Sequence, residues 1–424
     1  MMKPDLQTLE TLYEITRYLN SSLDLAEVLD YVMDQVIKVT GAERGFMMLI
    51  DSVTDELIFQ VARGMNQQDL DDPAFHVSHT IVREVVKTKE PVLTFDAQTD
   101  SRLDDAMSVI TKGLRSILCV PIMVRDKVIG LVYVDNRLRK GMFSQSHRYL
   151  LSAFASEAGF AIENARLYRV AVDQGRMQRE LEMARNIQQG LLPSMFDPIA
   201  GYEIAFDWRS AREVAGDFYD CFRFTDDRMG VVIGDVSDKG AAAAIFMAVV
   251  RSLFRGNAFS KPLPIDTVQL TNKLLLEDAS AGGMFVTLYY AVLEKDGQFL
   301  GVNAGHNRPL LYRASDGSIE FLPRGGNPLG WFDHIPLKLS ELQLRVGDTL
   351  IFYTDGLTEA ENNQQAAYGD ERLMTVVRES AGQHANQVKQ AILHSVNEFC
   401  GDAPMFDDLT IVVVRYIGVA SDGG

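Results

Sequence analysis

Cysteine is scarce in this chain, which contains three, Cys119, Cys221 and Cys400, in 424 residues. They are widely spaced and form no Cys-x-x-Cys pair. This excludes a disulfide framework and a thiolate zinc site, and it favours a reducing cytoplasm. Cys119 and Cys221 lie in apolar surroundings, so we expect both to be small buried core residues.

Basic residues are also in deficit, because 41 Lys and Arg stand against 58 Asp and Glu for a formal charge of −17. An extended nucleic-acid footprint is thereby excluded. The longest apolar run, Gly240–Val250, is too short to cross a bilayer, and Asp5, Glu10 and Glu14 in the opening segment do not fit a secretory signal. No Walker loop is present, which argues against a nucleotide kinase. We expect a soluble cytoplasmic protein with neither nucleic acid nor membrane as a partner.

The chain is too long for one core of ordinary size, so we expect two or three domains. Its first part is typical of an α+β domain. Asp24 is a suitable cap for a helix that runs to about Val39, and Gly41 ends that helix. A further helix is expected from about Gln145. Apolar runs predict strands at Gly45–Ile50, Leu57–Ala62, Ser116–Val124 and Lys127–Asp135.

The stretch Ser116–Tyr168, which opens "SILCVPIMVRDKVIGLVYVDN", resembles the C-terminal half of a GAF domain, a family of small-ligand sensors. The resemblance implies an antiparallel sheet with helices over residues 1–165. Cyclic-nucleotide-binding GAF domains carry Asn-Lys, then Phe, then an Asp-Glu pair. This chain has Asn136-Arg137 and Phe143, but His147-Arg148 in place of the acidic pair. Cyclic nucleotides are therefore disfavoured, and an unknown small-molecule ligand and a ligand-free dimerisation role both remain open.

A heptad-like stripe follows. Six apolar residues recur at spacings of 4, 3, 4, 3 and 4, namely Phe154, Ala158, Ala161, Ala165, Tyr168 and Val172. A second stripe, from Met177 to Leu191, begins after a step of five, so the phase changes near Gly175. We expect a helical coiled-coil linker at 166–194 that joins two protomers, is interrupted near Gly175 and ends before Pro193. The alternative is a solvated connector helix.

Acidic residues stand at the ends of strand-like runs in the C-terminal half. Asp235 follows Val231-Val232-Ile233, Asp355 follows an apolar run that ends at Tyr353, and Asp407-Asp408 precede the run from Leu409 to Val414. Asp217 follows Gly216 in a similar setting. Carboxylates placed where strands emerge can converge in space, and such oxygen donors suit Mg²⁺ or Mn²⁺. Metal-assisted phosphoryl hydrolysis is the function that this pattern favours.

The segment "ELEMARNIQQGLLP" (Glu180–Pro193) and seven ordered motifs after it resemble bacterial PPM-type phosphatases of the SpoIIE-like, sigma-factor-regulating kind. The motifs are "EVAGDFYD", "GVVIGDVSDKGAAAAIFMA", "GGMFVTLYYAVLE", "NAGHNRPLLYR", "GNPLGWFD", "LIFYTDGLTEA" and "DDLTIVVVR". The resemblance covers about 220 residues. It implies a phosphatase β-sandwich flanked by helices at 195–424.

The resemblance also implies roles for the acids. Asp235 would bridge two divalent cations, Mn²⁺ or Mg²⁺, with Asp217 and the Val236 carbonyl completing one position. Asp355 and Asp407 would serve the other position, and Asp408 would support the set. Asp217, Asp235, Asp355 and Asp407 are thus the expected catalytic residues. Two cations that share a water lower its pKa from about 16 toward neutrality, which supplies hydroxide for in-line attack on phosphorus.

Two positions leave the proton donor open. Animal relatives in the wider superfamily often carry a histidine two residues after the bridging aspartate, where this chain has Ser237. His306 lies in a Gly-His-Asn turn, and we expect a structural role for it, with Asn307 at the rim of the site. The predicted function is dephosphorylation of serine or threonine in a protein, such as an anti-sigma-factor antagonist, by a homodimer under GAF control. The alternative is a non-catalytic GAF dimer that binds partners through a phosphatase-like fold.

Overall fold

The structure, a computed structural model, describes residues 24–51, 54–65, 78–97, 115–261, 263–278 and 283–419, together with Tyr13 and Arg17. The chain divides into two compact units, Met1–Gly175 and Arg176–Gly424. Each unit is described by itself.

The first unit is an antiparallel five-stranded sheet with helices on both faces. The strand order is β2-β1-β5-β4-β3. Its elements are α2 (Leu25–Thr40), β1 (Arg44–Ile50), β2 (Leu57–Arg63), α4 (Ser78–Thr88), β3 (Val92–Thr94), β4 (Ser116–Val124), β5 (Lys127–Asn136) and the start of α6 (Gln145–Leu191). The four strands predicted from the sequence are confirmed to within one or two residues.

Local signals and burial explain this arrangement. The Asp24 carboxylate accepts the backbone N–H groups of Ala26 and Glu27, and Gly41 ends α2 in the left-handed region at φ 63°. One face of the sheet packs on α2 and α6, and the other packs on α4. Cys119 is buried in the second of these cores, as expected.

Helix α6 corrects two expectations. It is continuous over 47 residues and passes through Gly175, so the predicted interruption is wrong. Four residues of the first stripe, Phe154, Ala158, Ala161 and Ala165, are buried in the core of the first unit rather than on a free seam. Tyr168 and Val172, the last two, are 51% and 46% exposed. The helix ends at Leu191, before Pro193, as predicted.

The second unit is a sandwich of two antiparallel sheets. The strand orders are β13-β10-β9-β8-β7 and β12-β11-β14-β15-β6. The strands are β6 (Tyr202–Arg209), β7 (Phe218–Thr225), β8 (Arg228–Val236), β9 (Val286–Glu294), β10 (Gln298–Ala304), β11 (Leu310–Tyr312), β12 (Ile319–Phe321), β13 (Leu339–Gln343), β14 (Thr349–Tyr353) and β15 (Leu409–Tyr416). The helices are α7 (Ala241–Ser260), α8 (Pro264–Asp278), α9 (Asp355–Thr358), α10 (Gly369–Glu379) and α11 (Ala385–Cys400).

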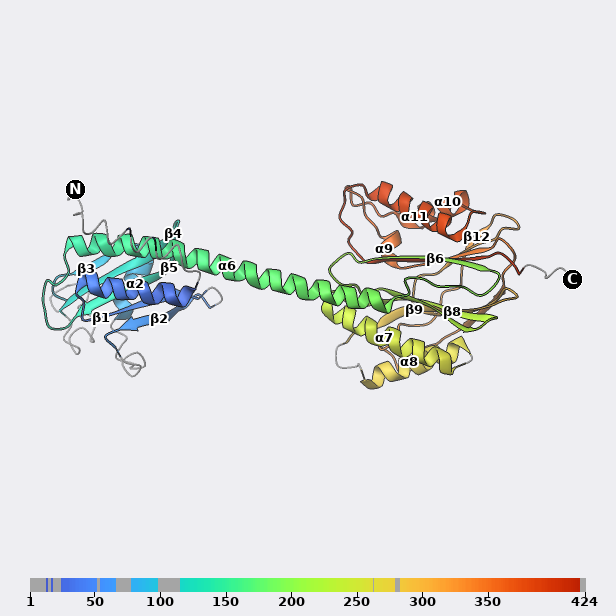
Figure 1. Cartoon of the computed structure of the whole chain (residues 1–424), viewed down its shortest axis with the longest axis horizontal. Helices are drawn as coiled ribbons and strands as arrows, with labels where there is room; N and C mark the ends of the chain where they lie inside the picture. Colours follow the sequence, from blue (N-terminus) through green and yellow to red (C-terminus); the bar gives the residue numbers. More distant parts are fainter. Residues whose placement is uncertain are drawn as a thin grey trace. The chain divides into compact units, whose positions relative to one another are not determined.

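The two outer faces of the sandwich carry the long helices. Figure 1 shows α7 and α8 over one sheet and α10 and α11 over the other. The inner faces of both sheets meet in one core, where Tyr289 contacts Phe352, and this core continues under α7, where Tyr290 contacts Phe254. A separate core lies under α10 and α11. This four-layer order leaves the two ends of the sandwich, where strands begin and end, to the loops.

Helix α7 is the one helix of the described residues that is long and apolar enough, by length and composition, to cross a membrane. One of its faces contributes Phe246, Met247 and Val250 to the core of the sandwich. Arg251 and Arg255 of α7 both pair with the buried Asp220 of β7 at 2.8 Å. These contacts fit a helix that covers a sheet.

Candidate metal centre

One edge of the sandwich gathers the predicted carboxylates. At this edge, called the carboxylate edge below, β8 and β14 end and β7 and β15 begin. Asp235 lies at the end of β8, Asp217 precedes β7, and Asp355 follows β14. Asp407 and Asp408 precede β15. The antiparallel order of the two sheets thus brings together residues up to 191 positions apart in the sequence.

Asp217 is the most deeply buried of the five, with 1% of its surface exposed. Its Oδ2 atom accepts the hydroxyls of Thr354 and Thr410, each at 2.7 Å. Burial, followed by repulsion from Asp235 and Asp408, raises the pKa of Asp217 well above its usual range, and the two hydroxyls oppose this shift. The sequence reasoning missed both threonines. The signal for Thr410 was a lone polar residue in an apolar strand.

Asp235 faces most of the other carboxylates. Burial and the charges of Asp355, Asp407 and Asp408 raise its pKa to about 7. Val236, whose carbonyl was predicted as a ligand, is buried at the end of β8. A Cβ on Gly216 would lie 3.0 Å from that carbonyl oxygen, which explains why glycine precedes Asp217.

Asp408 organises the backbone around the cluster. Its two oxygens accept the backbone N–H groups of Ala211 and Gly216, each at 2.8 Å. Gly356 allows the backbone after Asp355 to lie close to the backbone of Asp408, because a Cβ at that position would lie 2.0 Å from the Asp408 carbonyl oxygen. Asp408 therefore fixes the loop that carries Asp217.

Asp355 and Asp407 form the more exposed side of the cluster. Burial and the charges of Asp407 and Glu359 raise the pKa of Asp355, and Lys239 opposes the shift. The Lys239 Nζ atom donates to Asp407 Oδ2 at 2.9 Å and to the Phe406 carbonyl at 3.2 Å. Both side chains are about one third exposed, at 35% and 32%. The ion pair between Lys239 and Asp407 was not predicted from the sequence.

The donor set fits hard divalent cations. Five carboxylates lie close enough to repel one another, and a bound cation would relieve that repulsion. Within the described ranges, no group of three or more His, Cys, Asp or Glu side chains is already arranged around one point as a metal site. The fit therefore rests on donor type, burial and charge.

Ser237, His306 and Asn307 are the residues that the sequence analysis considered when it left the proton donor open. The Ser237 N–H donates to the Phe285 carbonyl and the Ser237 hydroxyl oxygen accepts the Phe285 N–H, both at 2.9 Å. His306 is buried, and its Nδ1 atom is 2.9 Å from Thr287 Oγ1. Burial lowers the pKa of His306 to about 3, so the ring is neutral and structural, as expected. Asn307 is half-buried beside it.

The end of α6 contacts the loop that leads to the cluster. The Gln188 side chain is buried, with Nε2 donating to the Ala215 carbonyl at 2.6 Å and Oε1 accepting the Ala215 N–H at 3.0 Å. Ala215 stands two residues before Asp217. The helix is thereby tied to the backbone that positions a predicted metal ligand.

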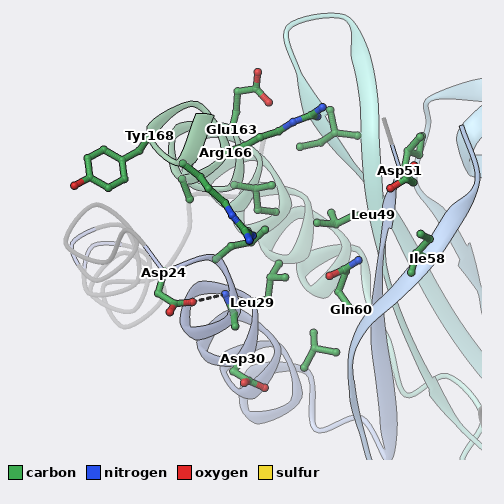
Figure 2. A pocket seen from close by; sticks show the side chains of 18 of the residues that line it. Asp24, Leu29, Asp30, Leu49, Asp51, Ile58, Gln60, Glu163, Arg166 and Tyr168 are labelled. Atoms are coloured by element: carbon green, nitrogen blue, oxygen red, sulfur yellow. Dashed lines mark hydrogen bonds between the residues drawn. The ribbon is translucent and has the colours of Figure 1, made fainter. Parts of the chain in front are cut away.

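The first unit contains a cavity of about 880 Å³ between α2, the β1–β2 hairpin and α6. Figure 2 shows Leu29 and Leu49 within it and charged side chains of both signs, Asp30, Glu163 and Arg166, around it. The cavity lies on the face of the sheet that α2 and α6 cover. It is large enough for a small organic molecule.

Comparison with known families matches both halves of the chain. A GAF domain model matches residues 22–163, and the model of stage II sporulation protein E (SpoIIE) matches residues 225–417. Protein IcfG of Synechocystis is 30% identical over 273 residues, which are 57% of this chain and 42% of IcfG. Phosphoserine phosphatase RsbU of Bacillus subtilis is 26% identical over 245 residues, which are 57% of this chain and 71% of RsbU.

Among solved structures, the SiaA PP2C domain of Pseudomonas aeruginosa superposes with a TM-score of 0.51 at 21% identity, over 58% of this chain and 99% of that domain. This likeness concerns the fold. The matched segments and the four-layer sandwich agree with the resemblance seen in the sequence. The chain carries a GAF domain followed by a SpoIIE-type phosphatase domain of the PPM family.

Proposed function

We propose that this protein is a metal-dependent protein serine/threonine phosphatase that its GAF domain regulates through helix α6. The observation that supports this most is the convergence of Asp217, Asp235, Asp355, Asp407 and Asp408 at one edge of a PPM-type sandwich. Residues that span 191 positions gain no stability from being gathered there, since the repulsion among them raises their pKa values. Such a cluster indicates a functional site.

The carboxylates and the Val236 carbonyl would together bind two divalent cations, Mn²⁺ or Mg²⁺. Asp235 would bridge them, Asp217 and the Val236 carbonyl would hold one, and Asp355 and Asp407 would hold the other. When bound, the cations would neutralise phosphoryl oxygens and acidify water for hydrolysis. Thr354 and Thr410 keep Asp217 oriented, and Asp408 keeps the loop before Asp217 in place.

The substrate we propose is a phosphoserine or phosphothreonine in a protein, such as an anti-sigma-factor antagonist. Similarity to RsbU, a phosphoserine phosphatase, supports this class. The acidic chain, with a net charge of −17, disfavours nucleic acid. We place the protein in the cytoplasm.

For regulation, we propose a GAF domain over residues 1–165, a helical linker over 166–194 and a catalytic domain over 195–424. Homodimers would form through the GAF domain and the exposed apolar residues of α6, which include Tyr168, Val172 and Met177. A small molecule bound in the cavity of the GAF domain would be the regulatory ligand.

The first experiment compares the wild-type chain with Asp235→Asn in Mn²⁺-dependent release of phosphate. Activity should fall by more than about 100-fold, since changes even to residues behind metal ligands cost 10–100-fold. Asp238→Asn is the matched control, because Asp238 is exposed in the same loop and its carboxylate only accepts the Lys239 N–H. Near-wild-type turnover in Asp235→Asn would remove the two-cation mechanism. Absence of Mn²⁺ binding to the wild-type chain would favour the non-catalytic alternative.

The second experiment compares the full chain with the fragment 176–424. The fragment starts at Arg176, where the second unit begins, so that it retains the Gln188–Ala215 contact. We expect different rates for the two proteins, and the sign of the difference gives the sign of regulation. Equal rates would argue that the GAF domain does not control catalysis.

A further inference from the structure

A second cavity, of about 410 Å³, lies in the phosphatase domain beside the carboxylate edge. It is lined by the loops after β10, β12 and β14. The strand pairings place the ends of β10, β12 and β14 at the edge where Asp235 lies. Thr358 of α9 also lines the cavity, and its hydroxyl bonds to the Asp355 carbonyl at 3.3 Å. The cavity is thus one helical turn away from a proposed metal ligand.

The floor of this cavity is rigid and uncharged. The Asn303 side chain accepts the His306 N–H at 2.8 Å and donates to the His306 carbonyl at 3.0 Å. The His306 ring bonds to Thr287 on the neighbouring strand and stays neutral near pH 7. The charge of the cavity therefore comes from its rim.

Arg308 is a fixed cation on that rim. Its Nε atom donates to the Leu322 carbonyl at 2.7 Å and Nη2 donates to the Phe321 carbonyl at 3.0 Å. The guanidinium also lies over the Phe321 ring, 5.0 Å from its centroid. These contacts use two of the five guanidinium N–H groups, and a guanidinium held in one orientation is well suited to bind a carboxylate.

Arg324 is the second cation, on the exposed loop after β12. Within the described residues it makes no ion pair. The one acidic residue of the lining, Asp370, accepts the Tyr353 hydroxyl at 3.4 Å. Two arginines against one aspartate make this a positive spot on a chain of net charge −17.

We propose that this cavity binds an aspartate or glutamate side chain of the phosphoprotein substrate, with Arg308 as the fixed partner and Arg324 as the exposed one. The inference rests on the proposed function and adds a specificity determinant to it. A positive pocket beside the site of hydrolysis selects sequences in which an acidic residue stands near the phosphorylated residue.

The test uses the full chain with Mn²⁺ and phosphoserine peptides that carry a single Glu, Gln, Lys or second phosphoserine at each of four positions on either side. The ratio of kcat/KM for Glu over Gln is measured within each protein, so a change in overall activity does not affect it. At one position the wild type should prefer Glu by about 1.5- to fivefold, the range of one partly exposed ion pair. Arg324→Ala should lower the ratio toward one. Arg324→Glu should make the peptide with Lys at that position the preferred substrate. Arg378→Glu, an exposed change on α10, should keep the wild-type ratio.

Each failure has a distinct meaning. If neither the peptides nor p-nitrophenyl phosphate are hydrolysed, the proposed function is wrong. If the peptides are hydrolysed without a preference for Glu at any position, or if Arg324→Glu keeps the wild-type preference, the acidic-residue site is wrong. A second phosphoserine preferred far above Glu at the same position would show that the cavity binds phosphate, which also overturns the proposal.

Discussion

The two hydroxyls on Asp217 allow a graded test of the metal site. Thr410→Val removes one of two donors to Oδ2 at nearly constant shape in a strand of apolar residues. A hydrogen bond to a charged group contributes about 1.5–3 kcal/mol. Cations bind the ionised carboxylate, so loss of the donor should weaken Mn²⁺ binding by about 10- to 150-fold.

Thr354→Val should act on two properties at once. Its hydroxyl donates to Asp217 and also accepts the backbone N–H of Thr410 at 2.9 Å. This variant therefore also leaves a buried N–H without its acceptor, at a cost of about 1–3 kcal/mol. For a unit of this size, that corresponds to a melting temperature roughly 2–12 °C below that of Thr410→Val.

The assay is a Mn²⁺ titration followed by calorimetry and by thermal melting of the full chain. Both variants should bind Mn²⁺ more weakly than wild type, and Thr354→Val should also melt at a lower temperature without metal. Wild-type affinity in Thr410→Val would refute the view that the hydroxyls support Asp217 as a ligand. Equal melting temperatures of the two variants would refute the account of the Thr410 N–H.

Three further outcomes are expected. The pKa of Asp235 is raised to about 7, so between pH 4 and 7 the folded metal-free chain binds more protons than the unfolded chain, and this residue lowers stability as pH rises. In melting curves recorded without metal, Asp235→Asn should therefore melt at a higher temperature than wild type at pH 7.5 but not at pH 4. Lys239→Met removes the ammonium 2.9 Å from Asp407 and should lower the Mn²⁺ concentration for half-maximal thermal stabilisation several-fold, whereas the control Lys261→Met should not change it. An unchanged titration in Lys239→Met would show that Lys239 does not oppose cation binding. A one-residue insertion at Gly175 turns the second apolar stripe of α6 by about 100° relative to the first, and it should change the phosphatase rate of the full chain but leave both units folded; an unaltered rate would make α6 a passive spacer.

The positions of the carboxylates could be predicted because each is marked locally. Asp235 and Asp355 end apolar runs, and Asp407-Asp408 begin one, so strand periodicity places them at strand ends. The resemblance to PPM phosphatases then orders them. The SpoIIE model matches 225–417, so Asp217 lies outside that segment, and its place was expected from the "EVAGDFYD" motif instead.

The contacts that hold the cluster could not be predicted in the same way. Thr354 and Thr410 bond to Asp217 across 137 and 193 residues, and such pairings depend on how two sheets stack. The heptad count did not identify what buries the first four residues of the stripe, for a related reason. A spacing of 3 and 4 identifies a buried face of a helix, but Phe154 and Ala158 are buried by their own sheet rather than by a second chain.

The expected interruption at Gly175 overestimated the effect of one glycine. Glycine in an exposed helix costs about 1 kcal/mol relative to alanine. No atom outside its own helix lies within 4 Å of a Cβ placed on Gly175, and the flanking residues are good helix formers without proline. The helix therefore continues through this residue, and the change of phase affects only which faces carry apolar side chains.

The Gln188–Ala215 contact connects α6 to the backbone that precedes Asp217 in the carboxylate cluster. A neutral amide that donates and accepts at the same time does not depend on pH or on the charge of the carboxylates. Rotation or translation of the helix end would therefore move the backbone before Asp217 in every protonation and metal state. If the GAF domain regulates catalysis through α6, as we propose, such a joint would shift the distance between charges without adding a charge of its own.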